Sequence, residues 1–280
     1  MTDVLARQER LERTFRGAFH VRDVAEALAS FDASTPAATV LERAERRGFA
    51  VVGVREHGLV TGYVNADDLK EARVCGDAIR PFEDDEVVAG GTPLDEGLRH
   101  LAGRDRVFVT AFGQVAGIVT WTDVQKPPAR MWLFGLVTLL EDSFTGLIEV
   151  WHPDESWTEL ISAGRLRKAK ELLRERRRHG ADVDLRLLDC LQLPDKGLIL
   201  LRREETRRLF DMPSKEAGER ALKKLAQLRN GLAHSQDIVT KDWDMILRLA
   251  GRLEEIVLLG STFARPRRAR RARPKKKPRS

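Results

Sequence analysis

Two seven-residue segments, GYVNADD at residues 62–68 and GIVTWTD at residues 117–123, share a glycine at the first position and an aspartate at the seventh. They lie 55 residues apart, and the same offset relates Gly58 to Gly113 just before them. Similarity at a fixed offset is the sequence signature of a duplicated structural unit. The first half of the chain therefore contains two copies of one unit.

The residues around both segments predict the same order of elements. In each copy a Thr-Pro pair precedes an amphipathic helix that stops at a glycine, a pattern typical of a helix start and stop. Two strands joined by a short turn follow, and each aspartate lies at the start of another short helix. The helix and strands are expected at residues 35–48, 49–54 and 59–64 in the first copy, and at residues 92–103, 107–110 and 115–119 in the second.

Both segments resemble a known sequence signature. It consists of a glycine, a hydrophobic residue, any residue, a Ser or Thr, and an Asp three positions later. This pattern is similar to the signature of cystathionine-beta-synthase (CBS) domains, which occur as tandem pairs called Bateman modules, and the resemblance covers residues 18–126. It implies an adenine nucleotide (AMP, ADP or ATP) as a regulatory ligand in the cleft between the copies. The residues assigned to this ligand are Gly117, Ile118, Val119, Thr120 and Asp123 in the second copy, and Gly62, Asn65 and Asp68 in the first.

The chemistry of the signature suits a nucleotide. Glycine permits close approach of the backbone. The hydroxyl of Thr120 can bond a phosphate or sugar oxygen, and the carboxylate of Asp123 can accept from ribose hydroxyls. The first copy has Asn65 in place of the hydroxyl, so we expect its site to be altered or empty. The alternative is that the pair serves only as a dimerisation platform.

The chain changes character at Pro127-Pro128, because proline removes a backbone donor and restrains the residue before it. Residues 127–262 have helical periodicity and predict an all-α domain. Its apolar run 131–140 is about half a bilayer span, so we expect a buried helix covered by other helices or by a second subunit, and no membrane span. Helices are expected at residues 129–151, 157–178, 185–193, 204–209, 214–231 and 243–259.

The hexapeptide RNGLAH at residues 229–234 fits the R-N-x-x-x-H pattern of HEPN domains, a helical superfamily of ribonucleases and nucleotide-binding proteins. The resemblance implies a metal-independent endoribonuclease with Arg229, Asn230 and His234 as catalytic residues. The imidazole of His234 suits a proton acceptor for a ribose 2′-hydroxyl. The guanidinium of Arg229 suits the stabilisation of the negative charge that develops on the phosphate during cleavage. Asn230 is expected to orient either Arg229 or His234.

The spacing within this hexapeptide adds a structural requirement. On one continuous helix, residues five apart differ by about 140°, so Arg229 and His234 of one chain do not point the same way. A two-fold interface that brings two copies of the helix together resolves this, and it predicts a homodimer for activity. The alternative is structural: Arg229 caps a helix or pairs with Asp237, His234 is a satisfied buried histidine, and Asn230-Gly231 is a common turn dipeptide.

The positive charge of the chain lies at its end. Residues 265–280 hold ten Lys or Arg and no acid, whereas residues 1–264 hold 39 Lys and Arg against 43 Asp and Glu. The tail, residues 263–280, is expected to be disordered and to bind RNA or another polyanion through counterion release, or simply to aid solubility. Two widely separated cysteines, expected to be buried thiols, and a charged N-terminal segment, residues 1–17, favour a reducing cytoplasm over secretion.

These features predict an α+β tandem CBS pair followed by an all-α domain and a basic tail. The expected function is an adenine-nucleotide sensor that controls a HEPN-like endoribonuclease. The alternative from another class is a non-catalytic nucleotide-binding sensor, or a dimeric scaffold that acts through a protein partner.

Overall fold

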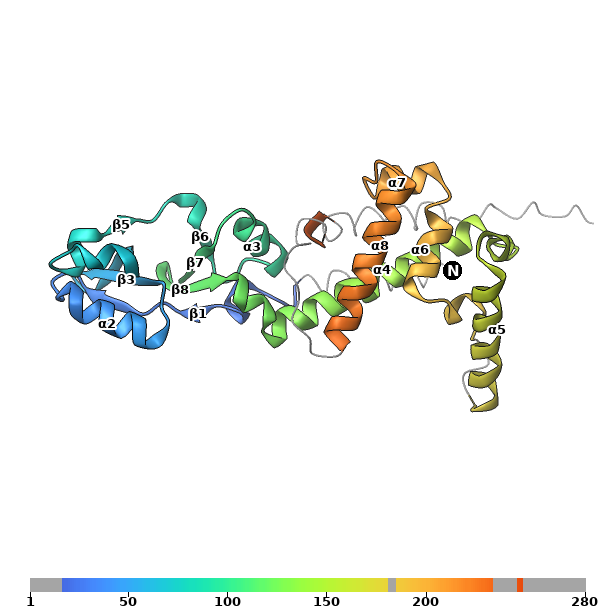
Figure 1. The fold of residues 1–280 in the computed structure, drawn as a ribbon, viewed down its shortest axis with the longest axis horizontal. Coiled ribbons are helices and arrows are strands. Elements are labelled where there is room, and N and C mark those ends of the chain that lie inside the picture. The colour runs from blue at the N-terminus through green and yellow to red at the C-terminus, as the bar shows by residue number, and fades with distance from the viewer. Residues whose placement is uncertain (1–16, 181–184, 234–245, 249–280) are drawn as a thin grey trace, which may run out of the picture. The chain divides into compact units, whose positions relative to one another are not determined.

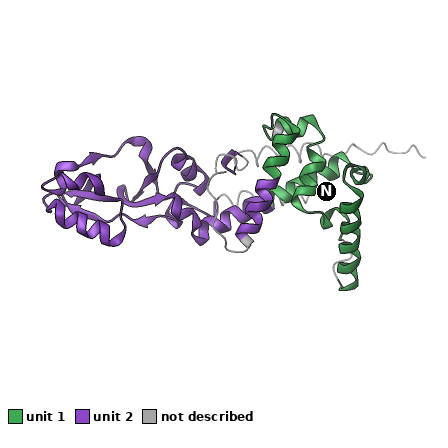
Figure 2. Ribbon diagram, viewed as in Figure 1, with its two compact units in different colours: residues 1–11, 139–222, 252–280 green, residues 12–138, 223–251 purple. Residues whose placement is uncertain are grey.

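A computed structural model of the chain describes residues 17–180, 185–233 and 246–248 (Figure 1). Contacts divide these residues into two compact units (Figure 2). One unit contains residues 139–222, apart from the four undescribed positions, and is helical; we call it the helical unit. The other joins residues 17–138 to the described residues of 223–251, and we call it the repeat unit. The domain boundaries expected from the sequence remain predictions.

The repeat unit contains both copies with the predicted order of helix, strand, strand and short helix. Glycines with positive φ follow both helices, and each hairpin turn has two residues of positive φ, His57-Gly58 and Phe112-Gly113. This pair of conformations is typical of tight two-residue hairpins. The elements are α2 (Ala37–Arg47), β3 (Val51–Glu56), β4 (Leu59–Asn65) and η2 (Ala66–Lys70) in the first copy, and α3 (Leu94–Leu101), β7 (Arg106–Ala111), β8 (Gln114–Thr120) and η5 (Trp121–Gln125) in the second.

Each sheet is completed by a short strand from the segment that precedes the other copy. Strand β1 (Glu26–Ala27) comes before the first copy but pairs antiparallel with β8 of the second. Conversely, β5 (Arg80–Pro81) comes before the second copy but pairs with β4 of the first. With β2 (Ser30–Asp32) and β6 (Val87–Ala89), the sheet orders are β2-β3-β4-β5 and β1-β8-β7-β6. The two copies are therefore interlocked.

A shared hydrophobic core joins the two sheets. The ring of Tyr63 on β4 lies 4.8 Å from that of Phe108 on β7, centroid to centroid, and Phe82 lies 4.7 Å from Phe108 edge-on. Phe108 is fully buried, with Leu28 and Val51 in the same cluster. Aromatic pairs of this geometry stabilise a core beyond the area that they bury. The repeat pair thus folds as one body, with its signature residues at the ends of β4 and β8.

The first glycine of each signature has a structural role. A Cβ atom at Gly62 would overlap the carbonyl oxygen of Arg80 on β5, and one at Gly117 would lie 3.0 Å from the carbonyl oxygen of Glu26 on β1. From the sequence alone, these glycines are expected to permit the close approach of a ligand. In the structure they permit the close approach of the exchanged strand.

We expect Gly62→Ala to lower the free energy of unfolding by about 1–3 kcal/mol, the usual cost of overpacking, because backbone atoms of β5 must move. Gly117→Ala is expected to cost less, since its contact is looser. Gly91→Ala, where a Cβ meets nothing within 4 Å, is the control. Urea unfolding of the three variants checks this order, and equal stability of Gly62→Ala and Gly91→Ala would contradict it.

The described part of the second half is helical, as predicted, with two differences. The expected helix 157–178 is divided, because Ser162 caps a new helix by accepting a hydrogen bond from the backbone of Arg165. The expected helix 185–193 is wrong: Leu188–Cys190 is a 3-10 turn, and a helix starts at Leu193 with Pro194 in its first turn, where proline favours initiation. The helices are α4 (Pro127–Trp151), η6 (Ser156–Leu160), α5 (Ala163–Arg178), η7 (Leu188–Cys190), α6 (Leu193–Leu200), α7 (Glu204–Leu209) and α8 (Lys215–Ala233).

Helix α4 is the longest described helix and is apolar on most sides. By length and composition alone it could cross a membrane, but 56% of its apolar window is buried within the protein. In the helical unit its Phe144 packs edge-on against Phe210, with ring centroids 5.4 Å apart. Other helices therefore cover much of α4, as one of the two sequence alternatives required. The expected helix at residues 243–259 lies mostly outside the described residues.

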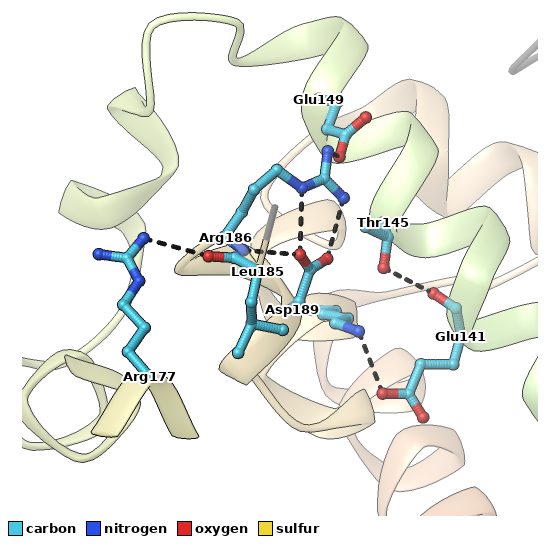
Figure 3. Close-up of polar contacts among 8 residues, drawn as sticks. Glu141, Thr145, Glu149, Arg177, Leu185, Arg186 and Asp189 are labelled. Atoms are coloured by element: carbon cyan, nitrogen blue, oxygen red, sulfur yellow. Dashed lines mark hydrogen bonds and ion pairs between the residues drawn. The ribbon is translucent and has the colours of Figure 1, made fainter. Parts of the chain in front are cut away.

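Charged side chains also join the helices of this unit (Figure 3). Arg186 lies between two carboxylates, those of Glu149 on α4 and Asp189 on η7. Lys196 on α6 is 5% exposed and places its ammonium 3.1 Å from the carboxylate of Glu141 on α4. A buried charge is tolerated only when it is paired, so the Lys196–Glu141 ion pair constrains how α6 packs on α4.

Candidate functional site

The second-copy signature forms a closed cluster at the end of β8. Asp123 is 4% exposed. One of its carboxylate oxygens accepts from the backbone amide of Thr120 at 2.6 Å and from the Thr120 hydroxyl at 2.9 Å. The same hydroxyl lies 2.8 Å from that of Thr122. The structure therefore brings together Thr120 and Asp123, the two side chains on which the sequence prediction depended.

Lys126 completes this cluster. Its ammonium lies 2.6 Å from Asp123 and 3.0 Å from Glu26, and it donates to the carbonyl oxygen of Val24 at 2.8 Å. Partial burial lowers the pKa of Lys126, but its hydrogen bonds to Asp123 and Glu26 outweigh burial and raise that pKa above its ordinary value. The signature residues 117–123 contain no Lys or Arg, so Lys126, three residues after Asp123, supplies the cation of this cluster. We call Thr120, Asp123, Lys126 and Glu26 the second-copy site.

The first-copy signature is closed by two arginines. The amide of Asn65 donates to Asp68 at 3.0 Å, and Arg80 donates to the same carboxylate oxygen at 2.7 and 3.1 Å. These hydrogen bonds, that of Asn65 first, lower the pKa of Asp68 below its ordinary value. Arg106 on β7 of the second copy donates to the Asn65 oxygen at 3.0 Å. We call Asn65, Asp68, Arg80 and Arg106 the first-copy site.

Arg106 also stacks on the core between the sheets. Its guanidinium carbon lies 5.1 Å from the ring centroid of Tyr63 and 6.0 Å from that of Phe108, within the range of cation–π attraction. In the first copy, the position equivalent to Arg106 holds Val51. The cross-copy hydrogen bond to Asn65 therefore has no counterpart at the second-copy site. The substitution that removes the hydroxyl from the first signature creates a link between the copies instead.

The exchanged strands carry opposite charges at equivalent positions. Arg80 on β5 pairs in register with Tyr63, and Glu26 on β1 pairs with Ile118, the residue 55 positions after Tyr63. Asp68 of the first signature therefore pairs with Arg80 from the exchanged strand. Asp123 of the second signature pairs with Lys126, which also contacts Glu26 of the exchanged strand. The signature itself gave no sign of Glu26, Arg80 or Arg106; only knowledge of the strand pairing reveals them.

A pocket of about 430 Å³ lies beside the second-copy site, within the usual range for small-molecule sites. Arg22, Glu26, Thr110 and Phe112 line it, together with small residues of β1, β8 and the turn after β6. Of the signature residues assigned to the nucleotide, only Gly117 lines this pocket. Its link to the site is Glu26, which both lines the pocket and contacts Lys126.

The cross-copy link predicts a stability coupling. Asn65→Thr restores the hydroxyl of the signature but removes the amide that joins Arg106 to Asp68. We expect it to lower the free energy of unfolding by about 1.5–3 kcal/mol, the range for a hydrogen bond to a charged group, and Arg106→Met to lower it similarly. In a double-mutant cycle measured by urea unfolding, the double variant should lose about 0.5–3 kcal/mol less stability than the sum of the two single losses.

The control for this cycle is Arg47→Met, which removes an exposed arginine from the last turn of α2. It should be additive with Asn65→Thr. Strict additivity between Asn65→Thr and Arg106→Met would show that the cross-copy hydrogen bond contributes nothing to stability.

The Arg229–Ala233 segment forms the last described turn of α8, in the repeat unit. Arg229 and Asn230 are exposed, and His234 lies outside the described residues. Because α8 runs through Asn230-Gly231, this dipeptide is helical, and the alternative that it forms a turn is wrong. The convergence of Arg229 and His234 across a dimer stays a prediction, as do the roles expected for residues 1–16 and for the basic tail, which also lie outside the described residues.

Arg130, in the first turn of α4, contacts this segment. Its guanidinium donates to the carbonyl oxygen of Gly231 at 3.1 Å and to that of Leu232 at 3.3 Å. The contact joins positions about one hundred residues apart in the chain. No feature of the hexapeptide pointed to this contact, which depends on how α4 and α8 pack.

The cysteine thiols and the possible metal ligands among the described residues show no sign of a further site. Cys75 and Cys190 are buried, as predicted, and burial raises the pKa of each thiol, which disfavours the nucleophilic thiolate. Within the part of the chain that the structure covers, no three His, Cys, Asp or Glu side chains are grouped to hold a metal ion. The candidate chemistry therefore centres on the two signatures and on the Arg229 segment.

The solved structures that this chain resembles are CBS-pair proteins. No protein-family model and no curated protein sequence matches it. Among solved structures, CBSX2 from Arabidopsis thaliana is 23% identical, with 38% of this chain and 91% of that chain covered and a TM-score of 0.33. CBSX2 in complex with AMP is 24% identical, with 38% and 92% covered and a TM-score of 0.33.

A third match is the CBS domain of a bacterial CNNM/CorC family Mg²⁺ transporter in complex with ATP. It is 18% identical, with 42% of this chain and 91% of that chain covered and a TM-score of 0.32. The matches share a CBS-pair architecture. At these scores the likeness carries no further argument, so the CBS resemblance rests on the duplicated signature and the interlocked sheets of this chain.

Proposed function

We propose that the repeat unit senses an adenine nucleotide through the second-copy site and thereby controls a HEPN-like endoribonuclease segment at Arg229–His234. The observation that carries the sensor is the arrangement of Thr120, Asp123 and Lys126. A hydroxyl, a carboxylate and an ammonium within hydrogen-bonding distance match the phosphate and ribose groups of a nucleotide. Each group already has a partner within the chain, so a nucleotide binds by exchange: ribose hydroxyls donate to Asp123 while a phosphate attracts Lys126.

The difference between the copies supports one nucleotide per chain. Asp68 is held by a guanidinium through two hydrogen bonds, and Asn65 is held by Arg106. A planar guanidinium in such a pair is fixed, whereas the ammonium of Lys126 is a point charge on a flexible stem. The second-copy site is thus the one whose internal partner exchanges more readily for a ligand.

We expect AMP, ADP or ATP at about 100 times Kd to stabilise the wild-type chain by about 2.7 kcal/mol. Asp123→Asn should abolish this gain, because an amide cannot replace both acceptor oxygens. Asp68→Asn should retain it. Thermal unfolding with and without nucleotide measures the response, and Asp84→Asn, an exposed carboxylate on η4 (Asp84–Glu86), is the control. An undiminished response in Asp123→Asn would remove the site assignment.

The ribonuclease half rests on the RNGLAH hexapeptide and on the exposure of Arg229 and Asn230 at the end of α8. In the proposed reaction, His234 accepts the proton of a ribose 2′-hydroxyl, which attacks the adjacent phosphate, and Arg229 stabilises the charge that develops there. The bond from phosphorus to the 5′-oxygen breaks and a 2′,3′-cyclic phosphate forms. The leaving 5′-oxygen takes up a proton from water, and His234 returns its proton to the solvent. No protein nucleophile or metal takes part. The basic tail of the chain would hold the RNA by salt-sensitive contacts with phosphates.

We expect RNA cleavage in EDTA, with a loss of about 100-fold or more in His234→Ala and Arg229→Ala, the usual contribution of a positioned proton acceptor or charge stabiliser. Arg220→Ala, which removes another exposed arginine of α8, should cleave normally. Because the proposal needs Arg229 of one subunit and His234 of its twin, a mixture of the two inactive variants should regain part of the activity. Inactive mixtures would contradict the dimer.

A non-catalytic sensor or scaffold is the second candidate function. The observation that favours it is that both signature carboxylates are already satisfied by side chains of the chain itself. A pair whose sites are filled internally suits a rigid platform for a partner protein. Lack of RNA cleavage by the wild type in EDTA, with and without nucleotide, would favour this function.

A further inference from the structure

Arg130 connects the two parts of the proposed function at the level of single hydrogen bonds. Its guanidinium donates to the carbonyl oxygens of Gly231 and Leu232, at 3.1 and 3.3 Å. Both carbonyls belong to the hexapeptide that bears Arg229 and His234. A cation at the last carbonyls of a helical turn is electrostatically favourable, and one planar guanidinium that bonds two successive carbonyls holds that turn in one orientation.

The other side of Arg130 is fixed to the second-copy site. Its backbone amide donates to the carbonyl oxygen of Lys126 at 3.1 Å, which is the first hydrogen-bonded turn of α4. The ammonium of Lys126 in turn contacts Asp123, Glu26 and the Val24 carbonyl. One helical turn therefore separates the Lys126–Asp123 ion pair from the hydrogen bonds of Arg130 to the hexapeptide. All these residues belong to the repeat unit.

A nucleotide at the second-copy site acts directly on the first part of this chain of contacts. A phosphate competes with Asp123 for the Lys126 ammonium, and ribose hydroxyls compete with that ammonium for Asp123. Either exchange releases Lys126 from the position in which it holds β1 and η5 to the start of α4. The carbonyl of Lys126 accepts from the amide of Arg130, so a change in the backbone at Lys126 would reach the first turn of α4.

We propose that Arg130 is the positioning residue through which nucleotide occupancy sets the geometry of residues 229–233, the described part of the hexapeptide. The proposal rests on the nucleotide site proposed above. It requires that the nucleotide bind two arrangements of this turn with different affinity, since a ligand shifts an equilibrium only by its differential binding. By linkage, the arrangement of the segment then alters nucleotide affinity by the same factor.

Hydrogen exchange of the full chain tests the coupling without relying on ribonuclease activity. Calorimetric titration with AMP and with ATP first measures binding, and exchange of peptides covering residues 229–233 is then compared with and without the nucleotide that binds. In the wild type we expect exchange there to change by about fivefold or more, the low end of ordinary coupling.

Arg130→Met keeps the aliphatic stem and loses every donor. It should bind the nucleotide within about threefold of the wild-type Kd, well under the tenfold that 1.4 kcal/mol represents, and show no exchange response at residues 229–233. Arg130→Lys, which keeps the charge and a donor, should retain part of the response, and it replaces the first variant if Arg130→Met does not fold. Arg99→Met, which removes an exposed arginine paired with Asp95 on α3, should behave as the wild type.

A full exchange response in Arg130→Met or in both Arg130 variants would overturn the coupling through this residue. Nucleotide binding by the wild type without any change at residues 229–233 would overturn it as well, while leaving the sensor site intact. Absence of binding heat with both nucleotides would instead refute the sensor, and the coupling with it. Failure of the coupling is thus distinguishable from failure of the site on which it rests.

Discussion

The exchange of two short strands is the constraint on which the repeat unit depends. Strand β1 completes the sheet of the second copy, and β5 completes that of the first, although each precedes the other copy in the chain. Neither copy can complete its sheet without the segment before its twin, so the pair folds as one body. The exchange also depends on the signature glycines, because a Cβ atom at Gly62 would overlap the carbonyl oxygen of Arg80 and one at Gly117 would lie 3.0 Å from that of Glu26.

The same exchange makes the two sites unequal. It brings Arg80 to the aspartate of the first signature and Glu26 to the neighbourhood of the second, at positions that the repeat relates to each other. Around Asp68, two guanidinium hydrogen bonds and the Asn65 amide leave a fixed network. Around Asp123, the partner is an ammonium that Glu26 also attracts, so its charge is shared. A ligand phosphate competes more easily for a shared ammonium on a flexible stem than for a guanidinium that is held by two hydrogen bonds.

Sequence reasoning predicted the elements of the repeat because each is set by local signals. The Thr-Pro helix starts, the glycines of the hairpin turns and the apolar runs of the strands all lie within or next to the element that they specify. It did not find Glu26, Arg80 or Arg106, because their roles depend on which strand pairs with which. The misplaced helix at residues 185–193 has a similar cause. Leucine-rich periodicity is equally compatible with a turn and a helix, and the start of α6 is decided by its first-turn proline.

Only Lys126 stands between η5 and α4 in the chain. Lys126 ends one and immediately precedes the other, so the residue that neutralises Asp123 is also the residue on which the first turn of α4 is built. A flexible linker at this point would not transmit a displacement of the site. A helix, whose amides are bonded to the preceding turn, passes that displacement to Arg130 and so to the carbonyls of the Arg229 segment. Because α4 follows the second-copy site directly, the contacts of Lys126 and those of Arg130 are coupled in the proposed mechanism.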